Sequence, residues 1–145
     1  MSGWFWIRTG AILGFLAVAI GAFGAHGFKE RLESLGTAAN YQTAVQYHMY
    51  HALALLAVGL VAIVGRPSTP LSVAGWGFLI GAIVFSGSLY ILALSGKKWL
   101  GAITPIGGVA MLIGWAAFAL ATSQIPSLAS TTRAEAQTLK EKSGP

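Results

Sequence analysis

Long apolar runs separated by short polar segments dominate the pattern along this chain. Four such runs occur, at about 4–25, 43–64, 71–94 and 99–122. Each holds about 20 residues or slightly more, which at 1.5 Å per residue is enough to cross a hydrocarbon layer of roughly 30 Å. The pattern therefore predicts an all-α integral membrane protein with four transmembrane helices.

The connections between the runs limit the arrangement of these helices. Segments 65–70 and 95–98 are short enough to join only antiparallel neighbours, and the prolines in the first of them cannot continue a helix. We therefore expect an up-and-down bundle with both termini on one membrane side, called side A. Loop 26–42 and turn 95–98 then lie on the opposite side, called side B.

The side-B loop carries a helical pattern of its own. Phe28, Leu32 and Leu35 recur at i, i+4 and i+7, with charged residues on the other face. This spacing predicts a two-turn amphipathic helix in the membrane interface, stopped by Gly36. Thr37 is then the expected cap of a helix that leads into the second span.

The composition fits lipid as the solvent. The chain of 145 residues is 55% hydrophobic with a mean hydropathy of +0.70, and 9% of it is charged, against roughly 25% for a soluble domain. A water-soluble fold is therefore excluded, and the absence of cysteine excludes disulfides and thiolate metal sites. The net charge of +5 is divided between two membrane faces, so nucleic-acid binding is not expected.

Charge also bears on orientation and on the chain ends. Side A carries five Lys and Arg residues and side B carries four, a balance too even for the positive-inside rule to fix the orientation. We expect both termini in the cytoplasm of the inner membrane. We divide the chain into a membrane domain, 1–122, and a polar, mostly disordered tail, 123–145, with a short frayed helix over 133–142. Residues 1–25 also resemble a cleavable signal, but the regular glycine spacing within them favours retention.

Small residues are placed along the spans at helical intervals. Such residues allow close backbone approach, which drives helix association in lipid, and their 3.5-residue spacing predicts left-handed crossing. A partner helix in this chain and a second copy of it are both compatible with the spacing, and a homo-oligomer or a larger membrane complex is a further expectation. The expected helix-packing glycines are Gly10, Gly14, Gly21, Gly24, Gly77, Gly81, Gly107 and Gly114.

Pro105 falls inside the fourth apolar run. It removes a backbone donor and frees the carbonyl of Gly101, and two glycines follow it. We expect a kink or an unwound turn at this point, and such a backbone persists in a membrane only when it is buried or lines a wet cavity.

The polar residues of the spans gather toward side B. If the bundle closes, they meet in one pocket below the side-B surface. The candidate pocket residues are His26, Gln46, His48, His51, Ser86, Ser88, Tyr90 and Thr104. The three histidines are compatible with a metal site, with haem ligation or with simple hydrogen bonding between helices. The last is the expected reading, so no metal or cofactor is predicted.

No catalytic constellation is visible in the sequence. The spans contain no acidic residue and the chain contains no Asp, so paired carboxylates, a Ser–His–Asp set and a carboxylate proton relay are all missing. We therefore expect no enzyme.

Four strings in the spans carry a family resemblance. They are 21–27 (GAFGAHG), 51–55 (HALAL), 85–90 (FSGSLY) and 100–108 (LGAITPIGG). Together they resemble the domain-of-unknown-function family 423, the YgdD and transmembrane-protein-256 family of small multi-pass membrane proteins. The resemblance covers 4–122 and implies four helices in a bacterial inner membrane. It supplies no reaction, ligand or site residue.

Three functions stay open at this point. The leading hypothesis is a non-enzymatic bundle in the lipid bilayer that binds a partner or a small ligand at the side-B pocket. The alternatives are a transporter or channel component, and an accessory subunit of a redox complex that binds haem or quinone.

Overall fold

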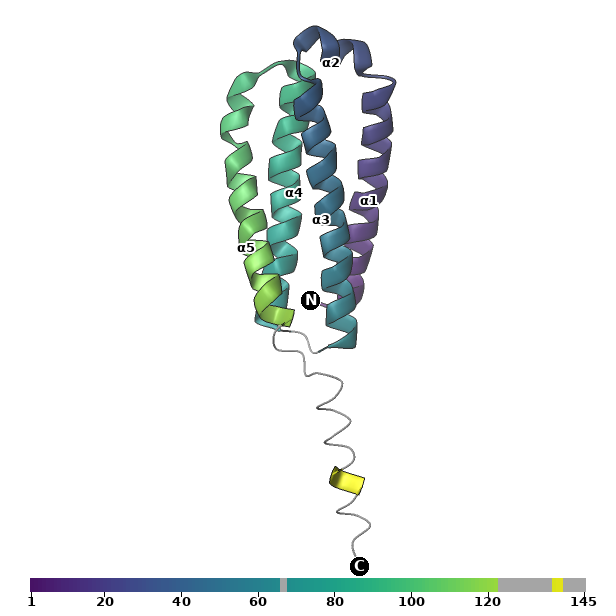
Figure 1. Ribbon diagram of the computed structural model, residues 1–145, viewed down its shortest axis with the longest axis vertical. Coiled ribbons are helices and arrows are strands. Elements are labelled where there is room, and N and C mark those ends of the chain that lie inside the picture. The colour runs from purple at the N-terminus through teal and green to yellow at the C-terminus, as the bar shows by residue number, and fades with distance from the viewer. Residues whose placement is uncertain (66–67, 123–136, 140–145) are drawn as a thin grey trace, which may run out of the picture.

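The protein is a bundle of four long helices with two short ones at one end (Figure 1). This computed structural model describes residues 1–65, 68–122 and 137–139. The helices are α1 Gly3–Ala25, α2 Lys29–Leu35, α3 Ala38–Val64, α4 Thr69–Ser95, the 3₁₀ helix η1 Lys98–Ala102, and α5 Thr104–Thr122. The predicted tail helix lies outside the described residues except for 137–139, which are helical, and the tail's predicted disorder also lies outside them.

The prediction of a four-span all-α membrane fold is confirmed. Four segments are long and apolar enough to cross a bilayer: the helices α1, α3 and α4, and the segment Lys98–Thr122 that joins η1 to α5. The second span begins earlier than the hydropathy pattern indicates, at Ala38, because polar residues of the side-B loop continue the helix outward. The start of α1 and the end of α5 lie at the same end of the bundle, which is side A (Figure 1).

The bundle is centred on α3 and α4. The main interfaces are α1 on α3, α3 on α4, and α4 on α5, so that α1 and α5 lie on the outside (Figure 1). Within their most apolar windows, α3 and α4 each bury 44% of positions, whereas α1 buries 11% and the fourth span 22%. Side chains buried inside this structure therefore belong mainly to α3 and α4, and the outer helices face lipid.

Close helix contacts are made at glycine positions within the chain itself. A Cβ on Gly10 would lie 2.8 Å from the carbonyl oxygen of Ala52 in α3, and one on Gly77 would lie 2.8 Å from that of Ala110 in α5. Gly107 meets the backbone of Phe85, and Gly24 meets the ring of Tyr41. The small-residue faces of α1 and α5 therefore pack against α3 and α4 of the same chain.

Not every glycine of the expected set is in tight contact. A Cβ on Gly14 would be 4.0 Å from its nearest neighbour, the Cβ of Ala52, which is an ordinary distance. A Cβ on Gly21 would lie at an intermediate distance, 3.2 Å from the Val45 side chain. A Cβ on Gly81 or on Gly114 would lie 2.5 or 2.7 Å from the nearest side chain. Two further close approaches involve Gly59 against α1 and Gly75 against the ring of Trp6.

The amphipathic helix predicted between the first two spans is present as α2. It ends at Gly36, whose φ of 64° is the left-handed conformation that glycine adopts most easily. Leu32 is buried and packs with Tyr41 and Ala93. In Figure 1, α2 lies across the side-B end of the bundle, between α1 and α3.

Hydrogen bonds fasten this end to the last turn of α4. The final carbonyls of a helix have no partner within it. The Thr37 hydroxyl donates to the Ala93 carbonyl at 2.7 Å, and Arg31 Nε donates to the Leu94 carbonyl at 3.2 Å. Thr37 thus stands at the N-cap position of α3, but its side chain caps the end of α4 instead.

Of the two irregularities expected at Pro105, a kink within the helix does not occur, whereas an irregular turn is present just before the proline. The irregular backbone lies before the proline, where η1 ends and Ile103 forms a turn, and α5 begins at Thr104. Pro105 therefore occupies the first turn of α5. Backbone N–H groups in a first turn have no acceptor within the helix, so the missing N–H of proline costs no hydrogen bond there.

Candidate functional site

Buried polar side chains form one layer across the interior. This polar layer consists of His48, His51, Ser86, Ser88, Thr104 and the half-buried Tyr90. On its side-A flank lies an apolar core built around Trp6, Leu55 and Phe78, and on its side-B flank lies the smaller cluster under α2. The layer belongs to α3, α4 and the start of α5.

His51 is fully engaged in hydrogen bonds. It is the middle residue of α3, about 20 Å from either end at 1.5 Å per residue. Its Nδ1 donates to the Tyr47 carbonyl at 2.8 Å, because a carbonyl can only accept. Its Nε2 then carries the lone pair and accepts from the Trp115 indole N–H at 3.3 Å. The ring is therefore the neutral Nδ1–H tautomer with no nitrogen left for a metal.

His48 differs in that one nitrogen has no partner. Its Nδ1 is 3.2 Å from the hydroxyl of Tyr90 on α4. Its Nε2 is buried without a hydrogen bond among the described residues, and the whole side chain is only 6% exposed. A buried polar atom left unpaired costs about 1–3 kcal/mol. Such an atom is a place where a polar molecule would be stabilised.

Ser86 is the second buried group without a partner. Its hydroxyl makes no hydrogen bond to the described part of the chain, and the residue is 1% exposed. It lies one helical turn before Tyr90, on the face of α4 that Tyr90 shares. Ser86 and His48 are each about 15 Å from the side-B ends of their helices, so the two unpaired groups occupy the same depth.

Ser88, two residues further along, is satisfied. Its hydroxyl lies 2.9 Å from the Thr104 hydroxyl and 2.9 Å from the Phe85 carbonyl. This pair links α4 to the start of α5, next to the irregular turn before Pro105. Ser88 and Thr104 thus have a structural role that Ser86 lacks.

The other two candidate residues lie outside the layer. His26 is exposed at the C-terminal end of α1, and Gln46 is exposed on α3. Of the eight residues expected to share a pocket, the structure therefore brings six into the interior and leaves two on the surface. Within the six, His48 Nδ1 pairs with Tyr90 and Ser88 pairs with Thr104, while His51 bonds to residues outside the set. His48 Nε2 and Ser86 Oγ have no partner among the described residues.

Aromatic rings surround the layer, and sequence reasoning missed their role. The Tyr47 ring stacks on Phe85 with centroids 4.6 Å apart, and Tyr41 contacts Tyr90 at 5.3 Å. Trp115 pairs with His51 although 64 residues separate them. A tryptophan inside an apolar helix needs an acceptor for its N–H, and that need is the one signal that points to such a partner.

The chemistry available to the polar layer is hydrogen bonding between neutral groups. The described residues contain no group of three or more His, Cys, Asp or Glu side chains that could hold a metal. The acids nearest to it in sequence, Glu30 and Glu33, are exposed on α2. Imidazole and hydroxyl groups at this position can donate to and accept from a small uncharged polar group.

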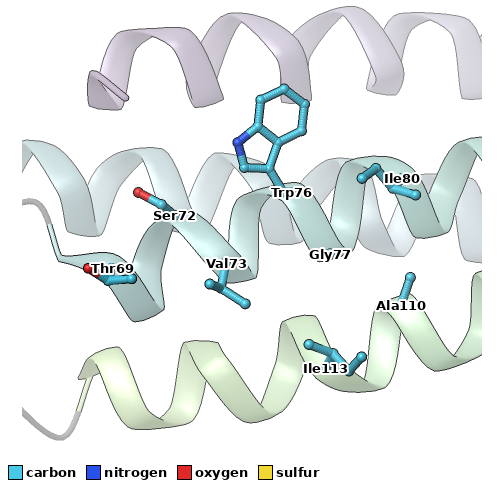
Figure 2. Close-up of a pocket in the computed structure, with 8 residues that line it drawn as sticks. All are labelled: Thr69, Ser72, Val73, Trp76, Gly77, Ile80, Ala110 and Ile113. Carbon is cyan, nitrogen blue, oxygen red and sulfur yellow. The ribbon is translucent and has the colours of Figure 1, made fainter.

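A groove lies elsewhere, on the side-A half of the molecule between α4 and α5 (Figure 2). Its volume is about 330 Å³. Its lining consists of Thr69, Ser72, Val73, Trp76, Gly77, Ile80, Ala110 and Ile113. It is separate from the polar layer, and sequence reasoning gave no sign of it because its walls come from two helices whose register was unknown.

Comparison with known proteins places the chain among bacterial membrane proteins. A family model described as "Protein of unknown function (DUF423)" matches residues 20–108. A "UPF0382 membrane protein" of Staphylococcus epidermidis is 46% identical over 116 residues, which are 80% of this chain and 93% of that protein. "UPF0382 membrane protein YwdK" of Bacillus subtilis is 47% identical over 109 residues, 75% of this chain and 88% of that one.

A third bacterial protein is similar to the chain. A "UPF0382 membrane protein" of Haemophilus influenzae is 42% identical over 118 residues, 81% of this chain and 93% of that protein. No solved structure matches the chain.

Proposed function

This chain belongs to the DUF423 family of membrane proteins, and we propose that it is a non-enzymatic binding protein whose polar layer holds a small ligand or a polar group of a partner. The observation that carries the proposal is the pair of buried, unpartnered groups, His48 Nε2 and Ser86 Oγ. They lie at one depth on facing helices. A membrane interior offers no water to satisfy them, so each favours a bound polar group.

The ligand class follows from the groups that would meet it. His48 and Ser86 each offer a neutral hydrogen-bonding group, and the Tyr90 ring, which Tyr41 contacts in turn, lies beside His48. Such surroundings suit an uncharged molecule with one carbonyl or hydroxyl and an apolar body. They do not favour a haem held between His48 and His51, because both nitrogens of His51 are already bonded.

The test is retention of a bound molecule after gentle detergent extraction at native expression, read by mass spectrometry. We expect the wild-type protein to carry an adduct that Ser86→Ala and His48→Phe lose. Ser88→Ala is the matched control, since Ser88 is also buried on the same helix but is paired with Thr104. The same spectra show whether the protein forms a homo-oligomer or remains with a larger membrane complex.

Two outcomes would overturn the proposal. In the first, the wild-type protein carries no adduct. In the second, Ser86→Ala and Ser88→Ala retain the adduct equally, which would leave Ser86 as a purely structural residue.

We also propose that both termini face the cytoplasm of the inner membrane. Support comes from the count of Lys and Arg along the sequence, with five in the segments assigned to side A and four in those assigned to side B. Because the chain has no cysteine, a single introduced thiol reports its own location. In intact cells, an impermeant thiol reagent should label Ser34→Cys on α2 and leave Ser2→Cys unlabelled. The reverse labelling would invert the orientation.

A further inference from the structure

The groove between α4 and α5 runs along the membrane normal from the side-A surface. Thr69 is the first residue of α4, and Ile80 lies about 16 Å further along the helix axis. Val73 and Trp76 lie between them on α4, and Ala110 and Ile113 form the facing wall on α5 (Figure 2). The long dimension of the groove is therefore parallel to lipid acyl chains.

The polarity of the groove changes with depth. α4 has 27 residues and is about 40 Å long, which exceeds a hydrocarbon core of roughly 30 Å by about a turn at each end. Thr69 and Ser72 thus stand at headgroup level, Trp76 lies about one turn below the boundary, and Ile80 lies deeper among the acyl chains. An occupant that is polar at its side-A end and apolar below matches this order.

α1 carries one cation, Arg8, near the side-A surface. The ring of Phe5 on α1 lies 6.3 Å from that of Trp76, and Arg8 follows Phe5 by three residues on the same side of α1. Arg8 is exposed and makes no hydrogen bond or ion pair with the part of the chain that the structure describes. It is about 8 Å from the start of α1, within reach of the headgroups for so long a side chain.

The direction of the groove, its polarity and the nearby charge all fit the same kind of ligand. We propose that the groove between α4 and α5 holds an acyl chain of an anionic phospholipid from the side-A leaflet, whose phosphate is attracted by Arg8. The apolar wall supplies dispersion contacts along the chain, and the guanidinium supplies a charged partner for the phosphate. This site is independent of the polar layer, so either can exist without the other.

The test counts phospholipids that remain on the full-length protein. The protein is reconstituted into vesicles of equal phosphatidylglycerol and phosphatidylcholine, extracted in a mild detergent and examined by native mass spectrometry. We expect the wild-type protein to retain one phosphatidylglycerol in preference to phosphatidylcholine. Ala110→Phe should lose it by filling the groove, whereas Val109→Phe, on the exposed neighbouring position, should keep it.

Two further variants guard against misfolding and separate the contributions. Ile113→Trp narrows the same groove from one turn further along α5. Leu112→Trp is its control, because Leu112 is exposed but does not line the groove. Arg8→Gln should keep a lipid in the groove but lose the preference for phosphatidylglycerol.

The proposal is overturned if both groove-filling variants retain as much phosphatidylglycerol as their controls. It is equally overturned if the bound species is a second copy of the chain. An unchanged preference in Arg8→Gln would refute the role of that charge.

Discussion

At the level of single residues, hydrogen-bond pairing divides the buried polar side chains into those that link helices and those that have a group without a partner in the described part of the chain. Ser88, Thr104 and His51 have their partners within the chain, whereas His48 Nε2 and Ser86 Oγ have none among the described residues. In lipid the difference is amplified, because no bulk water is present to satisfy a group that the protein leaves unpaired.

The two serines of α4 provide a matched pair for stability. In the ligand-free protein, Ser88→Ala should lower the free energy of unfolding by about 0.5–2 kcal/mol, because Thr104 loses its 2.9 Å partner on α4 and keeps only the longer bond to the Leu100 carbonyl. Ser86→Ala should leave it unchanged or raise it by roughly 1 kcal/mol, because an unpaired buried hydroxyl is removed. Thermal unfolding in detergent micelles measures both. Equal destabilisation would mean that Ser86 has an intramolecular partner.

His51 should act as a structural residue. His51→Leu leaves the Trp115 indole N–H without an acceptor, and we expect a loss of about 1–3 kcal/mol in unfolding free energy. A double-mutant cycle with Trp115→Phe isolates the pair, and the two losses should not add. Strictly additive losses would show that the two side chains do not interact.

At the level of elements, backbone approach at glycine decides how the helices pack. α1 presents its closest contacts to α3 at Gly3, Gly10 and Gly24, seven or fourteen residues apart, so one seam of the helix faces its neighbour throughout. The side-B end is fixed differently, by Thr37 and Arg31 bonding to the last carbonyls of α4.

Gly10 and Gly14 of α1 should respond differently to substitution by alanine. Gly10→Ala places a methyl group 2.8 Å from the Ala52 carbonyl oxygen and should cost about 1–3 kcal/mol as α1 moves away from α3. Gly14→Ala meets its nearest neighbour at 4.0 Å and should be tolerated. Unfolding in detergent distinguishes them. An equal loss of unfolding free energy in the two variants would indicate that α1 does not pack on α3 in this register.

The link from α2 to α4 can be tested at Thr37. Thr37→Val keeps the shape of the side chain but leaves the Ala93 carbonyl unpaired, so we expect a loss of about 1–2 kcal/mol. Thr43→Val is the control, because the Thr43 hydroxyl bonds only to the Ala39 carbonyl of its own helix. If Thr37→Val is as well tolerated as Thr43→Val, α2 does not fasten the end of the bundle.

The helices could be predicted from the sequence where the pattern of neighbouring residues is enough to indicate them. Hydropathy indicates the spans, and the spacing of Phe28, Leu32 and Leu35 before Gly36 indicates α2. The partners of His51 and Thr37 were not predictable, because they depend on the register between helices far apart in the chain. Pro105 was misjudged because hydropathy continues across the break that precedes it.

At the scale of the whole molecule, the bundle combines an apolar side-A core and a polar layer toward side B, and α2 covers its side-B end. The lipid-facing outer helices keep this layer away from the bilayer on the flanks. This arrangement, with a few polar groups positioned by helices and shielded from competing water, is compatible with the binding role that we propose.

The histidine rings report the state of this layer most directly. In the protein labelled with ¹⁵N-histidine and held in its native membranes, nuclear magnetic resonance should show His51 as the neutral Nδ1–H tautomer. The Nε2 signal of His48 should shift when Ser86→Ala removes the ligand, while His51 stays unchanged. A His48 signal identical in wild-type protein, Ser86→Ala and Ser88→Ala would contradict a ligand in the polar layer.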